Sequence, residues 1–194
     1  MNKFSVRDLV NAGVFSLLVV MATWCGGMIG FIPITMPLVP FACGIVSGPI
    51  FMLYATKIDK FGMILIMGVI FGLVFSMSGH GAITFPLIII FALLAEWIIR
   101  KGNYQSIKYA RLSYMVFMLF GAANLIPLYL ARDAYKASLI DQGYGVEYTD
   151  KLLAVMPTWS FVPVVALGMI GGYLGCTIGI KMLNKHFKKA GMIE

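Results

Sequence analysis

Six apolar stretches, each close to the length that crosses a bilayer, limit what this chain can fold into. They cover residues of about 9–30, 38–56, 61–78, 83–99, 109–130 and 156–183. A helix needs about 20 apolar residues to cross a hydrocarbon core of roughly 30 Å. We therefore predict an all-α integral membrane protein, in which a bundle of six transmembrane helices forms one domain over residues 1–194.

The composition leaves no room for a soluble domain. Hydrophobic residues make up 60% of the 194 residues and charged residues 12%, whereas a soluble domain carries about 25% charge. The net charge of +7 comes from cations scattered at the ends of the apolar runs, and a nucleic-acid site would need them in one patch. We expect the lipid bilayer, and no nucleic acid, as the surroundings of this chain. The first run is too long for a cleaved signal peptide.

The distribution of Lys and Arg predicts the orientation, because short loops retain their cations on the cytoplasmic side. Of the 15 cations, 12 lie before the first run, between runs 2 and 3, between runs 4 and 5, or after the last run. The other three lie in the long loop 131–155 beside four acidic residues. The sequence thus predicts a multi-pass protein of the plasma membrane with both termini in the cytoplasm and loop 131–155 outside.

The outer loop 131–155 has helix-capping signals. Asp133 could cap a short helix through Ile140, and Thr149 or Asp150 could cap the start of the last span, with a turn at 143–145 between them. A tyrosine-bearing amphipathic loop over a helix bundle suggests a lid. An interfacial connector with an aromatic belt fits the same residues.

Small residues recur at four-residue spacing, which lets helices approach closely where lipid gives no hydrophobic drive. The pairs are Gly26 and Gly30, Gly44 and Gly48, and Gly68 and Gly72, with a longer ladder over 168–179. We interpret them as internal packing of the bundle. The long ladder could also hold a helix of a partner.

The sequence contains no recognised catalytic motif. It has no GxxxxGK[ST] phosphate loop, HExxH, CxxC or GxSxG. Within the spans the only acidic residue is Glu96, which lies four residues before Arg100 in the order that favours a helical ion pair. We expect a structural Glu96–Arg100 pair, with a role in coupling as the alternative, and no enzymatic activity.

Aromatic, Met and a few polar residues gather near the predicted outer ends of the spans. Such surface suits a largely apolar ligand. The predicted ligand-binding residues are Trp24, Phe31, Phe75, Met77, His80, Asn124, Tyr129 and Trp159. An interfacial aromatic belt with core methionines would account for the same residues.

Several short segments resemble the Trep_Strep family of predicted substrate-binding S components of energy-coupling-factor (ECF) importers. The resemblance covers nearly the whole chain. It is carried by Val6-Arg7-Asp8-Leu9-Val10, Gly30-Phe31-Ile32-Pro33, Gly48-Pro49-Ile50-Phe51-Met52, Ser78-Gly79-His80-Gly81, Pro127-Leu128-Tyr129-Leu130 and Lys185-His186-Phe187-Lys188-Lys189-Ala190-Gly191.

The resemblance implies a bacterial six-helix S component with a transmembrane T subunit and cytoplasmic ATPases as partners, which would hydrolyse the ATP. S components generally carry an AxxxA-like face on the first helix for the T subunit. The matching positions here are Ala12 and Ser16. S components hold their ligand near the outer surface and topple to release it inside.

The substrate implied by the resemblance is a micronutrient, either haem or a vitamin-like compound. His80 is the only His before the C-terminal tail, so a metal-ion site is not predicted, and neither is a resident cofactor. His80 could be the axial ligand of a transported haem. The alternative functions are a stand-alone channel or facilitator, for which few polar residues line the spans, and a membrane scaffold without a ligand.

Overall fold

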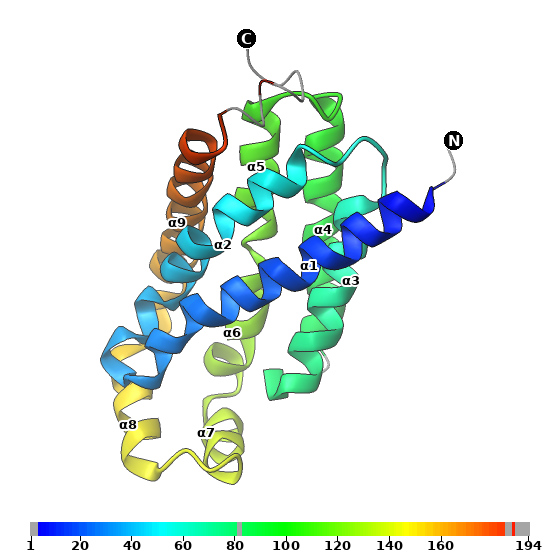
Figure 1. Cartoon of the computed structure of the whole chain (residues 1–194). Coiled ribbons are helices and arrows are strands. Elements are labelled where there is room, and N and C mark those ends of the chain that lie inside the picture. The colour runs from blue at the N-terminus through cyan, green and yellow to red at the C-terminus, as the bar shows by residue number, and fades with distance from the viewer. Residues whose placement is uncertain (1–3, 81–82, 185–187, 189–194) are drawn as a thin grey trace.

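The computed structural model describes residues 4–80, 83–184 and 188, and all regular elements in these ranges are helical (Figure 1). The α-helices are α1 (Val6–Gly27), α2 (Val39–Ala55), α3 (Met63–Phe75), α4 (Thr84–Lys101), α5 (Ile107–Phe117), α6 (Phe120–Leu130), α7 (Arg132–Asp141), α8 (Val146–Val155) and α9 (Phe161–Met182). The 3-10 helices are η1 (Met28–Phe31), η2 (Pro33–Leu38) and η4 (Thr158–Ser160), and η3 (Ser76–His80) is a π-helix.

The bundle has two distinct ends (Figure 1). Helix α1 begins and α9 ends at one of them, where the connections 56–62 and 102–106 also lie. We call this the basic end. The opposite end carries η1, η2 and η3 together with the helices α7 and α8. We call α7 and α8 the cover, and this end of the bundle the cover end. The loops predicted to be outside therefore lie at the cover end, and the loops predicted to be cytoplasmic lie at the basic end.

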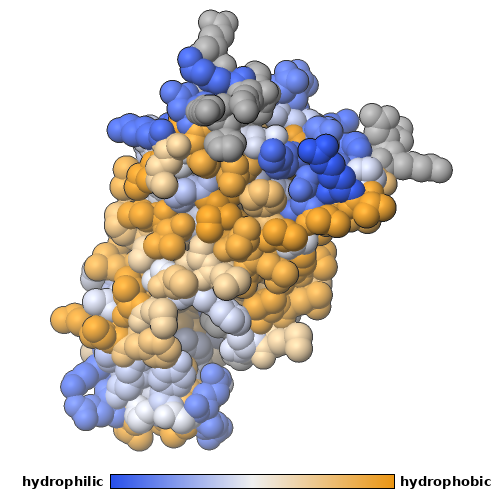
Figure 2. All heavy atoms as spheres, in the orientation of Figure 1, coloured by the Kyte–Doolittle hydropathy of each residue, from blue (hydrophilic) through white to orange (hydrophobic). Residues whose placement is uncertain are grey.

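Four helical segments are long and apolar enough to cross a membrane. They are Val6–Phe31, Pro33–Ala55, Ile107–Leu130 and Thr158–Met182. Helix α3 is shorter, and α4 holds Glu96, Arg100 and Lys101 within its 18 residues. Helices occupy all six predicted positions, and Figure 2 shows an apolar belt between two polar ends on the face in view. The count of six spans and the sidedness of the termini remain predictions.

Two of the predicted segments differ in detail from the structure. The fifth run, 109–130, lies within one apolar helical segment, Ile107–Leu130, which has a turn at 118–119 between α5 and α6, where Phe117, Met118 and Phe120 are all buried. The outer loop holds two helices instead of one. Its turn lies at Gly143 as predicted, with φ +92°, but Thr149 lies inside α8 and caps no span.

Helices α2 and α9 pack backbone against backbone. A Cβ on Gly48 would lie 2.5 Å from the carbonyl carbon of Gly175, and one on Gly179 would lie 2.7 Å from the Cα of Pro49. Any side chain at these positions would force the helices apart. The glycine spacing is thus internal packing, as predicted, and the ladder of α9 is occupied by α2, so the alternative of a partner helix there is wrong.

Packed aromatic rings fill the middle of the bundle. They come from α2, α3, α5 and α6 and are Phe51, Tyr54, Phe71, Phe75, Tyr114, Phe117 and Phe120. Neighbouring centroids lie 4.6 Å apart for Phe51 and Tyr114 and 5.1 Å apart for Phe71 and Phe117. The helices are therefore joined by a filled core and not arranged around an open channel.

Candidate functional site

A second hydrophobic cluster, separate from the central core, lies at the cover end. We call it the cover cluster. Its buried members are Leu125, Leu128, Leu139, Leu152, Met156 and Val164. The partly buried residues around them include Met36, Tyr129, Tyr135, Tyr144, Tyr148 and Phe161. Helices α6, α7, α8 and α9 and the 3-10 helix η2 all contribute to it, so this cluster joins the cover to the bundle.

Arg132 fastens the two cover helices to each other. Its guanidinium donates hydrogen bonds to the carbonyl oxygens of Leu153 and Met156, each at 2.7 Å. These carbonyls belong to the last turn and C-cap of α8, where the backbone lacks acceptor partners and the helix dipole favours a cation. The first residue of α7 therefore caps the end of α8.

Two further contacts hold the cover. The Tyr148 hydroxyl donates to the Gly30 carbonyl at 2.7 Å and ties α8 to η1. Lys136 on α7 and Asp150 on α8 form an ion pair at 2.5 Å. A shallow groove of about 370 Å³ runs along this seam, lined by Pro33, Gly145, Glu147, Tyr148 and Lys151. The groove thus lies where α8 meets η2, and Tyr148 belongs both to its lining and to the border of the cover cluster.

Tyr129 links α6 to the start of α9 beneath the cover. Its hydroxyl lies 2.8 Å from the Ser160 Oγ and 3.9 Å from the Met156 sulfur. Its ring meets Phe161 edge to face at a centroid distance of 5.0 Å. A hydroxyl pair beside a thioether and an aromatic ring can hydrogen-bond one polar group of a ligand and pack against its apolar body.

Three tyrosines of the cover lie close together. The rings of Tyr144 and Tyr148 are 5.0 Å apart. Burial, together with these two neighbours, raises the pKa of Tyr135 to about 12, so its phenol is neutral at physiological pH. In the ranges that the structure describes, no three His, Cys, Asp or Glu side chains gather as a metal site would require. The cluster offers neutral hydroxyls, thioethers and rings, which fit an apolar or weakly polar ligand.

The structure brings together only part of the predicted ligand-binding set. Tyr129 faces the cover cluster, and the half-buried Asn124 one turn earlier has a buried side-chain oxygen with no hydrogen-bond partner among the described residues. Phe75 instead belongs to the central core, stacked on Phe71. Met77, 86% exposed, and Trp159, 75% exposed, point away from any enclosed space.

Of the remaining predicted residues, Trp24 and Phe31 are not members of the cluster. Trp24 and Phe31 are exposed on α1 and η1. His80 ends the π-helix η3, and its side chain lies outside what the structure describes. The role of His80 as a ligand residue therefore stays a prediction.

Sequence reasoning missed most residues that build the cover cluster. Arg132, Tyr135, Tyr144 and Tyr148 were not among the predicted site residues, although four of the nine tyrosines of the chain fall between 129 and 148. This high density of tyrosines was the sequence signal that could have indicated the cover cluster. It could not show which tyrosines turn inward, because α7 and α8 were not both predicted.

The basic end contains a buried carboxylate, Glu96. It accepts hydrogen bonds from the backbone N–H groups of Ile64 at 2.7 Å and Leu65 at 3.1 Å. These are the first donors of α3, whose N-cap residue Gly62 has no side chain to cap them. The expected Glu96–Arg100 ion pair is therefore wrong. Glu96 caps a neighbouring helix, and the Arg100 guanidinium lies 5.5 Å from the centre of the Phe61 ring.

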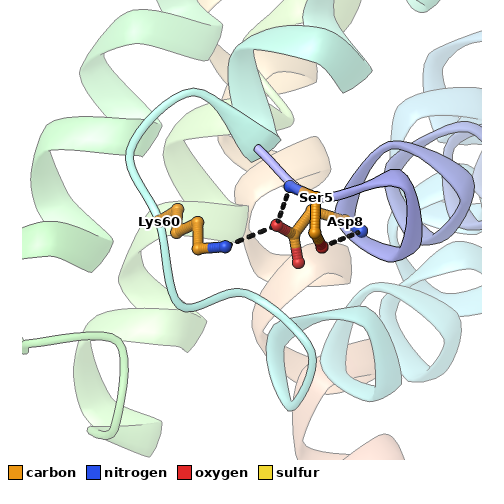
Figure 3. Close-up of polar contacts among 3 residues, drawn as sticks. All are labelled: Ser5, Asp8 and Lys60. Atoms are coloured by element: carbon orange, nitrogen blue, oxygen red, sulfur yellow. Dashed lines mark hydrogen bonds and ion pairs between the residues drawn. The ribbon is translucent and has the colours of Figure 1, made fainter. Parts of the chain in front are cut away.

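A second polar contact fastens the connection 56–62 to α1 (Figure 3). Ser5 and Asp8 form a reciprocal capping box at the start of α1. The same Asp8 carboxylate accepts a hydrogen bond from Lys60 at 2.6 Å, which raises the pKa of the Lys60 ammonium. Together with Glu96, this pair fixes the connection between α2 and α3 from both sides.

Ala12 and Ser16, the predicted partner interface, are fully buried inside the bundle. The Ser16 hydroxyl donates back to the Ala12 carbonyl at 2.5 Å, and α1 packs on α2 and α3. A partner helix could not touch these two residues in this conformation. Their small size serves the close packing of α1 on its own neighbours, and the sequence could not distinguish the two uses of the same spacing.

The comparisons with known proteins identify a family. Residues 6–189 match the model of a family described as "Hypothetical bacterial integral membrane protein (Trep_Strep)". The match covers most of the chain, which therefore belongs to this family of bacterial integral membrane proteins. No curated protein and no solved structure matches the chain.

Proposed function

We propose that this protein is the substrate-binding transmembrane subunit of an ATP-driven importer of the ECF type, and that it captures a small, largely apolar ligand beneath the cover. The observation that carries the proposal is the contrast between the two hydrophobic clusters. The cover cluster is enclosed by two short helices, which contribute only Leu139 and Leu152 to its buried residues and which few polar contacts hold in place. Such an element opens at a modest free-energy cost.

The filled core supports a binding subunit over a stand-alone facilitator. Seven aromatic rings occupy the middle of the bundle between the cover cluster and the basic end. A ligand bound beneath the cover would have no path through these rings, so its release on the other side requires the whole subunit to move. That movement needs energy from partners, which is the role of the T subunit and the ATPases in this proposal.

The partner helix would contact the exposed face of α1 instead of Ala12 and Ser16. This face carries Val10, Val14, Leu17 and Met21, all exposed. A photo-crosslinking amino acid at Leu17 should capture the T subunit in native membranes, and the same group at Ile170, exposed on α9, is the matched control. Equal capture from both positions, or none from Leu17, would place the interface elsewhere.

Partner identification tests the proposal most directly. The protein should be tagged in its native bacterium, extracted in mild detergent and purified, and its co-purifying proteins identified by mass spectrometry. We expect one multi-span membrane protein and at least one ATPase at stoichiometric amounts. Recovery of the protein alone at full yield, with transport intact in vesicles that lack ATP, would favour the facilitator and overturn the proposal.

The ligand is sought in the same preparation. Small molecules released by denaturation are identified by mass spectrometry and absorbance, and binding is repeated with haemin. If haem is the substrate, the protein shows a Soret band that His80→Ala weakens or shifts. A protein that stays colourless with haemin but binds a vitamin-like compound, with affinity lowered by Tyr129→Phe, would exclude haem and retain the importer subunit. A preparation that holds no ligand and binds neither class would favour the scaffold.

A further inference from the structure

A continuous apolar stripe on the outer surface of α4 ends in two cations. Ile90, Leu94, Trp97 and Lys101 follow the i, i+4, i+7, i+11 spacing of one helix face, and all are exposed. From Ile90 to Lys101 the helix rises about 16 Å. This is about half of the roughly 30 Å hydrocarbon thickness of a bilayer, so the stripe matches one acyl chain with its headgroup at the basic end.

The two cations at the end of this stripe are not neutralised by the protein. Neither Arg100 nor Lys101 forms an ion pair with a carboxylate in the described part of the chain. Arg100 is oriented by the ring of Phe61, 5.5 Å from its guanidinium carbon, and this contact leaves its N–H donors available. Glu96, the nearest acid along the helix, is buried and committed to the start of α3.

A hollow lies on the surface of α4 where the apolar stripe meets the two cations. Its volume is about 330 Å³, and it is lined by Trp97, Arg100 and Lys101. Trp97 is 59% exposed, and indole rings concentrate at the level of lipid headgroups. Residues 97, 100 and 101 share one face of α4, so the hollow lies along the side of its last turn, where cations are favoured by the helix dipole.

We infer that this hollow binds the phosphate of an anionic phospholipid, with Arg100 and Lys101 as the phosphate contacts and Trp97 packed against the glycerol region. The occupant is a lipid and not a free anion, because the cations continue directly into the apolar stripe of Ile90 and Leu94. The inference is independent of the proposed transport function, since it rests on the surface of α4 alone.

Tryptophan quenching by brominated lipid tests the site. Trp24→Phe and Trp159→Phe leave Trp97 as the only tryptophan, and the protein is reconstituted with bromine-labelled phosphatidylglycerol or phosphatidylcholine at equal mole fractions. We expect stronger quenching by phosphatidylglycerol. Lys101→Gln or Arg100→Gln should each reduce the preference about fivefold, the size expected for one cation at an anionic surface. Lys101→Arg should retain it.

The matched control is Lys181→Gln. Lys181 is an exposed cation in the last turn of α9, a helix that packs mainly on α2 and α5, and its loss should leave the preference unchanged. Equal quenching by the two lipids in the protein with all its cations would overturn the inference. So would displacement of the labelled lipid by millimolar inorganic phosphate, which would indicate a free-anion site, or an equal loss in Lys181→Gln, which would indicate only general surface charge.

Discussion

The central core and the cover cluster are both hydrophobic, but they are held together in different ways. The core joins helices through glycine backbones and stacked rings, as at Gly48 against Gly175 and Phe51 against Tyr114. The cover is held by the packing of Leu139 and Leu152 in the cover cluster and by polar contacts at a few points, namely Arg132 on α8, Tyr148 on η1 and Lys136 with Asp150.

This difference indicates which part can move. Interlocked backbones have no second arrangement close in free energy, because close-packed interiors do not deform continuously. Single hydrogen bonds contribute about 0.5 to 3 kcal/mol, the larger values for charged groups, and exposed ion pairs about 1 kcal/mol or less, so we expect the cover to open while the core stays intact. The following substitutions test this contrast, from the largest expected effect to the smallest.

Gly175→Ala should give the largest loss of stability. The added Cβ would meet the backbone of Gly44 and lie 2.9 Å from the Cα of Ile45, so α2 and α9 must separate, at a cost of about 3 kcal/mol or more. Gly13→Ala is the matched control, because a Cβ there meets nothing within 4 Å. Thermal unfolding in detergent measures both. A Gly175→Ala protein as stable as Gly13→Ala would show that the seam is not tightly packed.

Glu96→Ala should be the next most damaging change. It leaves the N–H groups of Ile64 and Leu65 without their acceptor inside the protein, and leaving a buried donor unsatisfied costs about 1 to 3 kcal/mol. Glu96→Gln retains an oxygen that can accept from one of them and should lose less. Hydrogen exchange at the start of α3 would locate the effect. Equal losses for the two variants would mean that the carboxylate charge, and not the cap geometry, matters.

Arg132→Ala should loosen the cover without unfolding the bundle. It removes the two hydrogen bonds to the last carbonyls of α8, worth about 1 to 2 kcal/mol locally. Hydrogen exchange across 132–155 should speed up while the exchange of α2 and α9 stays unchanged. Faster exchange throughout the bundle would show that cover and core unfold as one unit, which would remove the contrast.

Tyr148→Phe should have a smaller effect of the same kind. The loss of its hydrogen bond to Gly30 costs about 1 kcal/mol and should accelerate ligand release. Tyr144→Phe is the control, because its hydroxyl makes no hydrogen bond within the described residues while its ring stacks on Tyr148. Release rates from stopped-flow measurements decide this. Identical rates for the two variants would show that the contact with η1 does not hold the cover closed.

Glu147→Gln should have the smallest effect. Lys151, one turn later on α8, lowers the pKa of the Glu147 carboxyl through a hydrogen bond at 2.6 Å. A lowered pKa means that the pair helps α8 above the ordinary pKa of Glu and that this help is lost as the pH falls through the lowered value. The variant should match the parent protein in acid and differ from it little at neutral pH, because both groups are exposed. A large loss at neutral pH would mean that surface charge, and not Arg132, fastens the cover.

The sequence by itself determined the membrane class, the positions of the helical runs and the positions at which helices can approach closely. These follow from local quantities: run length, hydropathy and the spacing of small residues do not depend on which helices become neighbours. The sequence also predicted that the bundle has two different ends, because the cation-rich connections alternate with the connections that include the long loop 131–155. Tyr129 was likewise placed near the predicted outer end from its position in the sequence alone.

The tertiary structure decided which surfaces meet. Glu96 and Arg100 have the spacing of a helical ion pair, yet Glu96 binds the start of α3, because that helix begins at a glycine and lacks a cap of its own. Ala12 and Ser16 could have faced a partner or the bundle, and they face the bundle. Phe75, a predicted ligand residue, belongs to the central core, and Tyr148, which was not in the predicted set, contacts η1. In each case the deciding interaction is made with residues far away in the sequence, so the local sequence pattern cannot predict it.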